Sequence, residues 1–362
     1  MNRKIYSIGV MSGTSLDGLD IALCEFNLEN EQVQSFEIQE AITIPYTESQ
    51  KESLKLMQAS ALDLVKADFA FGKLIGESVK AFVASKRLKV DFVASHGHTV
   101  FHQPHLGFTS QIGNGAAISA ACGLPVVSDF RSMDVAMGGQ GAPLVPIGDL
   151  LLFGQYKYCL NLGGIANISV KENGRIYAFD VCPANMPLNM LVNKIGLQYD
   201  EDGKLAKSGS INQDLLAQLN ALDFYAKKPP KSLGKEWVDT IFMPIITSSS
   251  VNLEDMLATI CEHIALKISQ VVSESNGISK MLVTGGGAFN SFLIERIQAK
   301  LKNRCELVVP DSQLVGFKEA LIFAFLGLLR VQNKPNALQS VTGASNNNIG
   351  GAMYGDFSSL YH

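Results

Sequence analysis

The sequence predicts a two-lobed α/β protein built from a duplicated unit. An order of strand, tight turn, strand, third strand and helix begins near residue 5 and returns near residue 158. At about 150 residues per domain, a chain of 362 residues corresponds to two domains or one bilobal unit. Its hydrophobic content of 47% is enough for a sizeable core. Two such units facing each other form a cleft, in which loops from both lobes hold a ligand.

The first copy of the unit starts as a hairpin with a polar tip. Gly, Ser, Thr and Asp at the tip break the apolar pattern, and amphipathic helices follow the third strand. The expected elements are strand Ile5–Val10, turn Met11–Gly18, strands Leu19–Phe26 and Val33–Ile44, helices from about Ser49 to Lys66 and Asp68 to Arg87, and a buried strand Phe92–Ser95.

The second copy repeats this order and is followed by further helices. It comprises strand Tyr158–Leu162, turn Gly163-Gly164, strands Ile165–Val170 and Arg175–Asp180, and helix Met186–Ile195. After it we expect helices at about Ile211–Leu222 and Leu253–Ser275, strand Lys280–Thr284, the run Gly285–Gly287, helix Ser291–Leu301 and an apolar helix Glu319–Leu329. The Pro-rich piece Lys227–Lys231 predicts a mobile exposed loop, and Asn333–Asn336 a turn.

Charge and composition exclude several classes of protein. The net charge is −4, and no Lys/Arg run is long enough to follow a nucleic-acid backbone. The longest apolar stretch, Ala320 to Leu329, is about half of the ~20 residues that span a membrane. The N-terminus lacks a signal-peptide pattern, and the six cysteines are scattered without a C-x-x-C pair. We therefore expect a cytoplasmic protein that binds neither nucleic acid nor membrane.

The tip of the first hairpin, Ser12–Gly18, is suited to a phosphate group. Glycine frees backbone N–H groups, the hydroxyls of Ser12, Thr14 and Ser15 can donate, and Asp17 could position Mg²⁺ directly or through water. An ordinary hairpin turn is the alternative, because Ser, Asp and Gly favour turns for local reasons. The lysine of a Walker A loop is missing, which disfavours a P-loop NTPase.

Two further glycine-containing turns fit a nucleotide. Leu160–Asn167 occupies in the second copy the place of Ser12–Gly18 in the first. Gly285, Gly286 and Gly287 form a flat backbone wall for a purine, with Asn290 at the start of the next helix. The alternative is that these glycines exist only for close packing.

Two acids are candidates for chemistry. Asp180 ends a strand at the predicted cleft, where apolar neighbours would raise its pKa and suit it to be a general base. A helix cap or loop acid is the alternative. Glu319 begins the apolar helix and could cap its dipole or reach Mg²⁺.

Histidines and one arginine mark a polar region between the copies. His96, His98, His102 and His105 fall within ten residues, but no neighbouring cysteine or acid completes a zinc site, so a polar pocket after Phe92–Ser95 is favoured. Arg131 lies in a long polar loop and is suited to binding a carboxylate through its fork of donors, with a structural Arg–Asp pair as the alternative.

These motifs together resemble the bacterial anhydro-N-acetylmuramic acid kinases, essentially from end to end. The resemblance is carried by Gly9-Val10-Met11-Ser12-Gly13-Thr14-Ser15-Leu16-Asp17-Gly18, Gln111–Pro146 with its Gly138-Gly139-Gln140-Gly141-Ala142-Pro143, Leu160–Asn167 and Ser340-Val341-Thr342-Gly343-Ala344-Ser345. It implies the actin-like ATPase fold, with duplicated ribonuclease-H-like lobes and an interlobe cleft. One lobe would comprise residues 1–130 with a tail from about 345, and the other residues 131–345 with an adenosine-binding segment.

The resemblance also implies an activity. ATP and water would convert 1,6-anhydro-N-acetylmuramic acid into N-acetylmuramic acid 6-phosphate and ADP in cell-wall recycling, with Asp180 as the base that deprotonates the water. Phosphoryl transfer would rest on positioning and on Mg²⁺. The family is usually dimeric, so a homodimer is expected.

Site residues follow from matching this chain to the motifs. Arg131 would bind the lactyl carboxylate that distinguishes muramic acid from glucosamine. The sugar-binding set is His96, His98, Arg131 and Asn185, and the metal set is Asp17 and Glu319, directly or through water. The ATP-binding set is Ser12, Gly13, Thr14, Ser15, Leu16, Asp17, Gly18, Leu19, Asp20, Gly163, Gly164, Asn167, Gly285, Gly286, Gly287 and Asn290.

The chain departs from the family pattern after its candidate base. Asp180-Val181-Cys182-Pro183-Ala184-Asn185 stands where Asp-Thr-Gly-Pro-Gly-Asn is common, Asn189 replaces an acid, and His98 replaces a glutamine. Three alternatives stay open: a kinase for another sugar, a nucleotide-gated binding protein, and a catalytically impaired relative.

Overall fold

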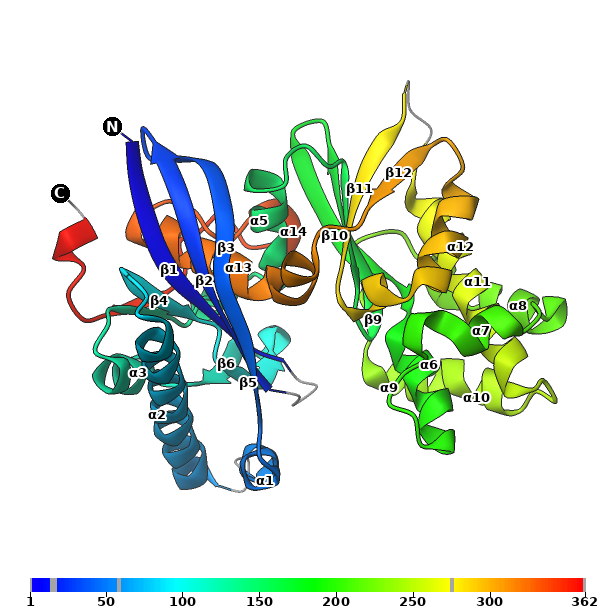
Figure 1. Ribbon diagram of the computed structural model, residues 1–362, viewed down its shortest axis with the longest axis horizontal. Helices are drawn as coiled ribbons and strands as arrows, with labels where there is room; N and C mark the ends of the chain where they lie inside the picture. Colours follow the sequence, from blue (N-terminus) through cyan, green and yellow to red (C-terminus); the bar gives the residue numbers. More distant parts are fainter. Residues whose placement is uncertain (1, 14–17, 57–59, 274–276, 361–362) are drawn as a thin grey trace. The chain divides into compact units, whose positions relative to one another are not determined.

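The protein, described by a computed structural model over residues 2–13, 18–56, 60–273 and 277–360, divides into two compact units (Figure 1). Unit 1 comprises Met1–Leu152 and Phe317–His362, and unit 2 comprises Phe153–Gly316. Both contain a mixed β-sheet covered by helices. In the described part of the chain, no helix is both long and apolar enough to cross a membrane.

The sheet of unit 1 has six strands in the order β13-β7-β4-β1-β2-β3. Strands β1, β2 and β3 form an antiparallel meander, β4 and β7 continue the sheet parallel to β1, and β13 closes the edge antiparallel to β7. Their bounds are β1 Asn2–Ser12, β2 Gly18–Glu29, β3 Gln32–Pro45, β4 Phe92–Ser95, β7 Val126–Ser128 and β13 Ala352–Tyr354.

Helices cover both faces of this sheet because side chains alternate along β1. Ile8 and Val10 are buried in a cluster with side chains of α2 (Ala61–Lys86). Gly9 faces the opposite way, toward α13 (Ser312–Val331), where an added Cβ would lie 1.8 Å from the Ala320 carbonyl oxygen. Glycine at position 9 therefore permits α13 to approach β1 closely.

Shorter elements complete unit 1. They are α1 Glu48–Leu56, β5 His98–Gln103, η1 Pro104–Leu106, β6 Phe108–Ile112, α3 Gly115–Cys122, α4 Ser132–Ala136, α5 Val145–Leu151, α14 Gln339–Thr342 and η7 Ser358–Leu360. Strands β5 and β6 pair as a separate two-stranded sheet, a hairpin that the sequence patterns did not predict.

The sheet of unit 2 repeats the arrangement of unit 1. Its order is β10-β9-β8-β11-β12, with β8, β9 and β10 antiparallel and β11 and β12 parallel to β8. The bounds are β8 Tyr158–Leu162, β9 Ile165–Glu172, β10 Arg175–Pro183, β11 Ser279–Thr284 and β12 Cys305–Val308. The third, second, first, fourth and fifth strands of each copy are thus neighbours, which confirms the predicted duplication and the ribonuclease-H-like lobes.

One large apolar cluster forms the core of unit 2. Tyr158, Leu160 and Leu162 of β8 point into it, together with the buried face of α11 (Leu253–Val271). The other helical segments are α6 Asn185–Val192, η2 Asn193–Ile195, η3 Glu201–Gly203, α7 Lys204–Ser208, α8 Gln213–Asn220, η4 Asp223–Ala226, α9 Lys235–Trp237, η5 Val238–Phe242, α10 Met243–Thr247, η6 Gly286–Phe289 and α12 Ser291–Leu301.

Several boundaries differ from those expected. The first two helices divide near residue 60 instead of 67, because the Ser60 hydroxyl accepts a hydrogen bond from the Asp63 N–H and caps α2. The compact units divide at residues 152 and 317, whereas the lobes were expected to divide near 130 and 345. The reason is that α5 and the second part of α13 pack together in unit 1, where Lys318 and Asp149 form a buried ion pair of 2.7 Å.

Candidate functional site

In unit 1, Arg131 is held by His96. The imidazole Nδ1 lies 2.9 Å from the Gly97 carbonyl oxygen, which makes this nitrogen the N–H donor and Nε2 the acceptor. Arg131 Nε and Nη2 donate to Nε2 at 3.0 and 2.8 Å, and Nη1 donates to the Gly141 carbonyl at 2.6 Å. The guanidinium is therefore oriented by a neutral histidine and a carbonyl, instead of the Arg–Asp pair that was the alternative.

Burial controls the charge state of both groups. It lowers the pKa of His96 to about 3, and the neighbouring Arg131 cation adds to this. Burial also lowers the pKa of Arg131 to about 10, against the attraction of Glu319 and Asp134. At neutral pH the pair is thus a neutral imidazole beside a cationic guanidinium.

His96 also lines a polar cavity of about 200 Å³ in unit 1. The cavity lies at the carboxyl ends of the parallel strands β4 and β7, the edge at which ligands bind in sheets of this kind. Among the polar side chains that line it are Ser95, Gln111, Asn114, Ser128, Asp129 and Ser132. The polar pocket expected after Phe92–Ser95 is present and includes His96.

The other histidines of the run lie apart from this cavity. His98 is buried, and its Nδ1 lies 3.0 Å from the Ser12 hydroxyl, which accepts a hydrogen bond of 2.7 Å from the Tyr46 hydroxyl. Burial lowers the pKa of His98 and raises that of Tyr46 to about 12, so both groups are neutral near pH 7. His102 and His105 are exposed on the β5–β6 hairpin and its turn.

The predicted phosphate turn is described only at its two ends. Ser12 is 2% exposed and uses its hydroxyl in the chain from Tyr46 to His98. At the other end, Gly18 and Leu19 are buried in β2. Thr14, Ser15, Leu16 and Asp17 lie outside the described residues.

Glu319 is an acidic group near Arg131 in unit 1, and Asp20 lies near Glu319. Loss of surrounding water raises the pKa of Glu319, Arg131 acts against this, and the Asp20 carboxylate adds to it. The Glu319 side chain keeps a solvent-exposed surface. Asp20 accepts a hydrogen bond of 2.5 Å from the Thr43 hydroxyl. Carboxylate oxygens are hard ligands of the kind that Mg²⁺ binds, which keeps Glu319 a candidate for the predicted metal site.

In unit 2, a row of polar side chains crosses four strands. Asp180 on β10 lies opposite Asn167 on β9, Asn167 lies opposite Asn161 on β8, and Asn161 lies beside Thr284 on β11. Residues paired across a sheet share a face, and this row lies on the face opposite to that of Leu160 and Leu162 in the core. The strand register thus brings together Asp180 and Asn167, which were predicted, and Asn161, which was not singled out.

The surroundings of Asp180 suit a base. Its carboxylate is half-buried, and burial raises its pKa, while the backbone N–H of Leu233 donates to Oδ2 at 2.8 Å and acts against that rise. The register of β9 and β10 shifts between Asp180 and Cys182, which marks a β-bulge at the acid. Bulges often redirect a side chain beside an active site.

The glycines of unit 2 serve two purposes. A Cβ on Gly285, whose φ is +82°, would lie 2.4 Å from Asn161 Oδ1, and one on Gly287 would lie 2.8 Å from Asn185 Oδ1. Close packing, the alternative considered, therefore explains both. Gly286 is exposed, and a Cβ there would meet only Asn185 Nδ2 at 3.6 Å. Gly286 is thus the glycine of this run that presents open backbone to a ligand.

Asn185 and the Gly163-Gly164 turn are tied together. Asn185 donates its side-chain amide to the Leu162 carbonyl at 2.9 Å and its backbone N–H to the Gly163 carbonyl at 3.0 Å. Gly164 accepts from the N–H groups of Ala184 and Met186. These contacts give Asn185 a role in holding the turn.

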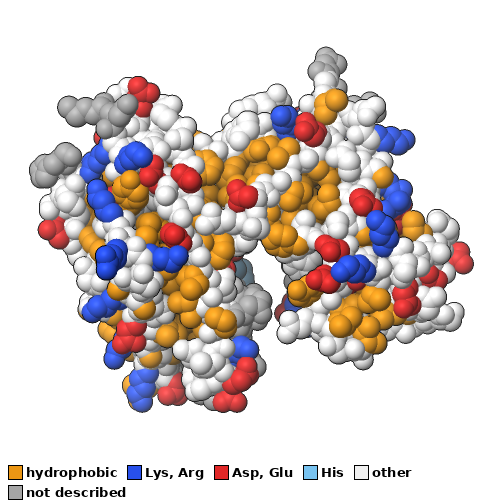
Figure 2. Space-filling view, in the orientation of Figure 1, with side chains coloured by type: hydrophobic (Ala, Val, Ile, Leu, Met, Phe, Trp, Pro, Cys, Tyr) orange, Lys and Arg blue, Asp and Glu red, His pale blue; other side chains and the backbone are white. Residues whose placement is uncertain are grey.

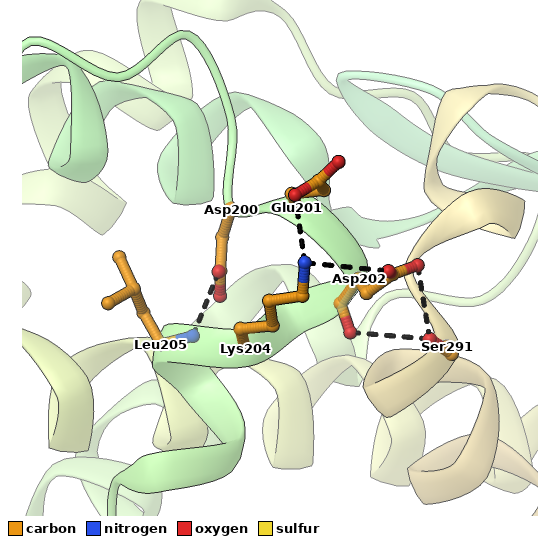
Figure 3. A network of polar contacts seen from close by, with 6 residues as sticks. All are labelled: Asp200, Glu201, Asp202, Lys204, Leu205 and Ser291. Carbon is orange, nitrogen blue, oxygen red and sulfur yellow. Dashed lines mark hydrogen bonds and ion pairs between the residues drawn. The ribbon is translucent and has the colours of Figure 1, made fainter.

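Figure 3 shows the polar contacts that join Ser291, the first residue of α12, to Asp202, and those around Asp200 and Lys204. Asp200 accepts hydrogen bonds of 2.9 Å from the N–H groups of Leu205 and Ala206 in the first turn of α7. The Ser291 hydroxyl donates to Asp202 at 3.3 Å. Asn290 caps α12 by accepting from the Leu293 N–H at 2.9 Å, so its predicted place at the helix start is confirmed.

Sequence reasoning missed the partners that orient the predicted residues. Tyr46 and Leu233 carry no motif, and only their contacts with Ser12 and Asp180 single them out. Asp134 is fully buried and accepts from the Gly141 N–H, the Thr342 hydroxyl and the Asn348 amide at 2.7 to 2.8 Å. It thereby joins the Gly138–Pro146 loop to the Ser340–Ser345 segment.

Comparison with known proteins gives a family match over nearly the whole chain. Residues 5–356 match the family described as anhydro-N-acetylmuramic acid kinase. Proteins of that name from Vibrio cholerae and Mannheimia succiniciproducens are 36% and 35% identical; the matches cover 95% and 94% of this chain and 96% of each relative.

Likeness to solved structures is weaker. A ROK family glucokinase from Streptomyces griseus, solved with glucose and AMPPNP, has 15% identity and a TM-score of 0.37, with 89% of this chain and 98% of that chain covered. The activator of the 2-hydroxyisocaproyl-CoA dehydratase from Clostridium difficile has 15% identity and a TM-score of 0.41, with 91% and 97% covered.

Proposed function

The chain belongs to the anhydro-N-acetylmuramic acid kinase family and is therefore a phosphotransferase that uses ATP, and from this premise we propose that Asp180 activates water to open the 1,6-anhydro ring while the sugar O6 receives the γ-phosphoryl group. The observation that carries the assignment is the geometry of Asp180. Its Oδ2 accepts a hydrogen bond from the Leu233 N–H, whereas Oδ1 accepts none from the described residues. Oδ1 is then the oxygen available to take a proton.

The proposed reaction couples opening of the 1,6-anhydro ring to transfer of the phosphoryl group. Oδ1 of Asp180 removes a proton from water as the water oxygen bonds to the anomeric carbon, and the bond from that carbon to O6 breaks. O6 leaves with the electron pair of that bond, attacks the γ-phosphorus, and ADP departs. The raised pKa that burial gives Asp180 suits proton abstraction near neutrality.

Arg131 is proposed to bind the lactyl carboxylate of the sugar. Three of its N–H groups are used by His96 and Gly141, and a guanidinium has five. Counted over the described residues, two donors are therefore left for a ligand. Because His96 is neutral and fixed by Gly97, it orients the cation without cancelling its charge.

In unit 2, we propose the Gly163-Gly164 turn and the glycine run Gly285–Gly287 as elements that bind ATP. Gly163 and Gly164 lie at the turn between β8 and β9, and Gly286 presents exposed backbone at the start of η6. Glu319, with Asp20 beside it, would hold Mg²⁺ largely through water, and the bound cation would neutralise phosphate charge. Water and phosphate oxygens would complete the coordination of the cation.

The departures from the family pattern that follow Asp180 lie inside unit 2. Val181, Cys182 and Ala184 are buried in its apolar core, whereas the Asp180 carboxylate is half-buried on the polar row. The unusual residues therefore fill space behind the base, and this supports an active enzyme over an impaired relative.

The cellular compartment and the partners of the protein are also proposals. All six cysteines are free, which supports a reducing, cytoplasmic environment. In Figure 2, Lys and Arg side chains lie among acidic ones on the face shown, so this face offers no basic strip to a nucleic acid. The homodimer expected from the family is proposed on that resemblance alone.

Isotope labelling tests the proposed reaction. The protein is incubated with ATP, Mg²⁺ and 1,6-anhydro-N-acetylmuramic acid in ¹⁸O-water, quenched early, and the product analysed by mass spectrometry and ³¹P NMR. We expect ¹⁸O at C1 and phosphate on O6. Product incubated alone in ¹⁸O-water corrects for exchange at the anomeric carbon. Early product without ¹⁸O at C1 would contradict the mechanism.

A further inference from the structure

The segment 227–234, called the strap below, bonds to Asp180 through two backbone contacts. The Asp180 N–H donates to the Lys231 carbonyl at 3.0 Å, and the Leu233 N–H donates to Asp180 Oδ2 at 2.8 Å. Strand β10 is the edge strand of its sheet, so its outer side is free to pair with the strap. Residues 227–230 are exposed, as the sequence predicted for this loop, but Lys231 and Leu233 are anchored.

Aromatic packing anchors the strap to unit 2. The Lys231 ammonium lies 4.5 Å from the centre of the Phe224 ring and donates to the Phe224 carbonyl at 3.4 Å. Phe224 is itself buried against Trp237 and Tyr225. A cation above an aromatic face is attracted to it, and the attraction strengthens as water is removed. The carbonyl of Lys231 is thereby held in place for Asp180.

We infer that the strap positions the catalytic base: the Leu233 N–H fixes Oδ2 of Asp180 and keeps the carboxylate ionised, so that Oδ1 faces the water to be activated. This inference rests on the proposed function, in which Asp180 is the base. A hydrogen bond donated to a carboxylate favours its charged form and acts against the effect of burial. Leu233 acts through its backbone and is a positioning residue.

The ionisable groups around Asp180 are not expected to titrate on the acid side of the pH profile of kcat/KM. The acid limb of that profile therefore reports the Asp180 carboxyl itself. Cys182 on β10 and Tyr225 on η4 both have a pKa raised by burial and are neutral at working pH. Lys231 on the strap and Lys267 on α11 have a pKa lowered by burial. Both ammonium groups lie over aromatic rings, Lys231 over Phe224 and Lys267 over Tyr225.

Replacing the Leu233 amide with an ester tests the inference. The α-hydroxy analogue of leucine, incorporated at position 233 of the full chain, removes the N–H and keeps the side chain. We expect the acid limb of kcat/KM for the sugar to move up by about one pH unit, with kcat at the low-pH side about tenfold lower and KM for ATP unchanged. Leu233→Ala is the matched control, because it keeps the N–H and should leave the acid limb in place.

A second variant keeps the test decisive if the ester protein does not fold. Pro229→Gly with Pro230→Gly loosens the strap without changing its charge, and should move the acid limb in the same direction by a smaller amount. Lys228→Ala, an exposed change on the same segment, is its control. A fall in melting temperature with an unchanged acid limb would show that the strap is only structural and would overturn the inference.

Asp180→Asn separates this inference from the proposed function. If Asp180→Asn is active, the assignment of the base fails. If Asp180→Asn is inactive and the ester leaves the acid limb unmoved, the base stands and the strap inference fails.

Discussion

Asp134 accepts a hydrogen bond of 2.8 Å from the hydroxyl of Thr342, which lies 208 residues further along the chain. The same oxygen accepts from the Asn348 amide, and the other oxygen accepts from the Gly141 N–H. A fully buried carboxylate is tolerated when it is hydrogen-bonded in this way. The loop that carries Arg131 therefore depends on the C-terminal segment of unit 1.

Removing that carboxylate should destabilise unit 1. Asp134→Ala leaves three buried donors without their acceptor, and we expect the free energy of unfolding to fall by about 3 kcal/mol or more. Asp311→Ala, which removes an exposed cap from the Leu314 N–H, should cost only about 1 kcal/mol. Urea unfolding of both variants compares them, and equal losses would show that Asp134 is not an anchor.

Removing the base should abolish turnover and spare nucleotide binding. In Asp180→Asn the amide keeps the shape but cannot take a proton from water, so kcat should fall by ~10²–10⁴. ATP affinity, measured by calorimetry, should stay near that of the unchanged protein. A variant that keeps more than about a tenth of the activity would mean that another group is the base.

Arg131 should govern the affinity for the sugar. Loss of a charge-assisted contact in Arg131→Ala should raise KM for the sugar by roughly 10- to 150-fold and leave KM for ATP unchanged. Arg131→Lys should recover part of that loss, because it keeps the charge and loses the fork. The assignment is overturned if KM for ATP rises while that for the sugar holds.

Glu319 should set the requirement for Mg²⁺. In Glu319→Gln we expect the Mg²⁺ concentration at half-maximal rate to rise about tenfold or more. Glu77→Gln, an exposed acid on α2, is the control and should match the unchanged protein. The same titration of Asp17→Ala tests the predicted metal role of the turn. An unchanged requirement in Glu319→Gln would remove this residue from the metal site.

Buried histidines should make the protein sensitive to acid. Burial and Lys267 lower the pKa of His263 to about 3, whereas in an unfolded chain it is about 6.5. Between these values the unfolded chain binds the extra proton, so the free energy of unfolding falls as pH is lowered through this window, by at most about 1.4 kcal/mol per pH unit.

Two variants isolate this effect. His263→Gln should lower the slope of the free energy of unfolding against pH by the contribution of one proton, at most about 1.4 kcal/mol per pH unit. Tyr225→Phe removes the hydroxyl that lies 2.7 Å from His263 Nε2 but keeps the imidazole, so it should lose stability and retain the slope. Measuring the free energy of unfolding between pH 4 and 7 gives this slope for each variant. An unchanged slope in His263→Gln would show that His263 is not the group that binds the extra proton.

The sequence by itself determined the repeated architecture. Alternating apolar residues and glycine-containing turns are local signals, and they predicted the hairpins of both copies, the strand that ends near Asp180 and the cap residue Asn290. The second helix begins at Ala61 and not at Asp68, because the Ser60 hydroxyl caps it by accepting from the Asp63 N–H, a signal that is also local in the sequence. The motifs carried the family resemblance that the comparisons then matched over residues 5–356.

Only the tertiary structure decided how the site residues are held. His96 and Arg131 are 35 residues apart, Asp180 and Leu233 are 53 apart, and Asp134 and Asn348 are 214 apart. Such contacts depend on the path of the chain between the two residues and on which groups burial leaves in need of a partner. Residue type and spacing predict Asp180 as an acid that ends a strand. In the structure β10 continues to Pro183 with a bulge after Asp180, and the folded chain selects the backbone N–H that orients the carboxylate.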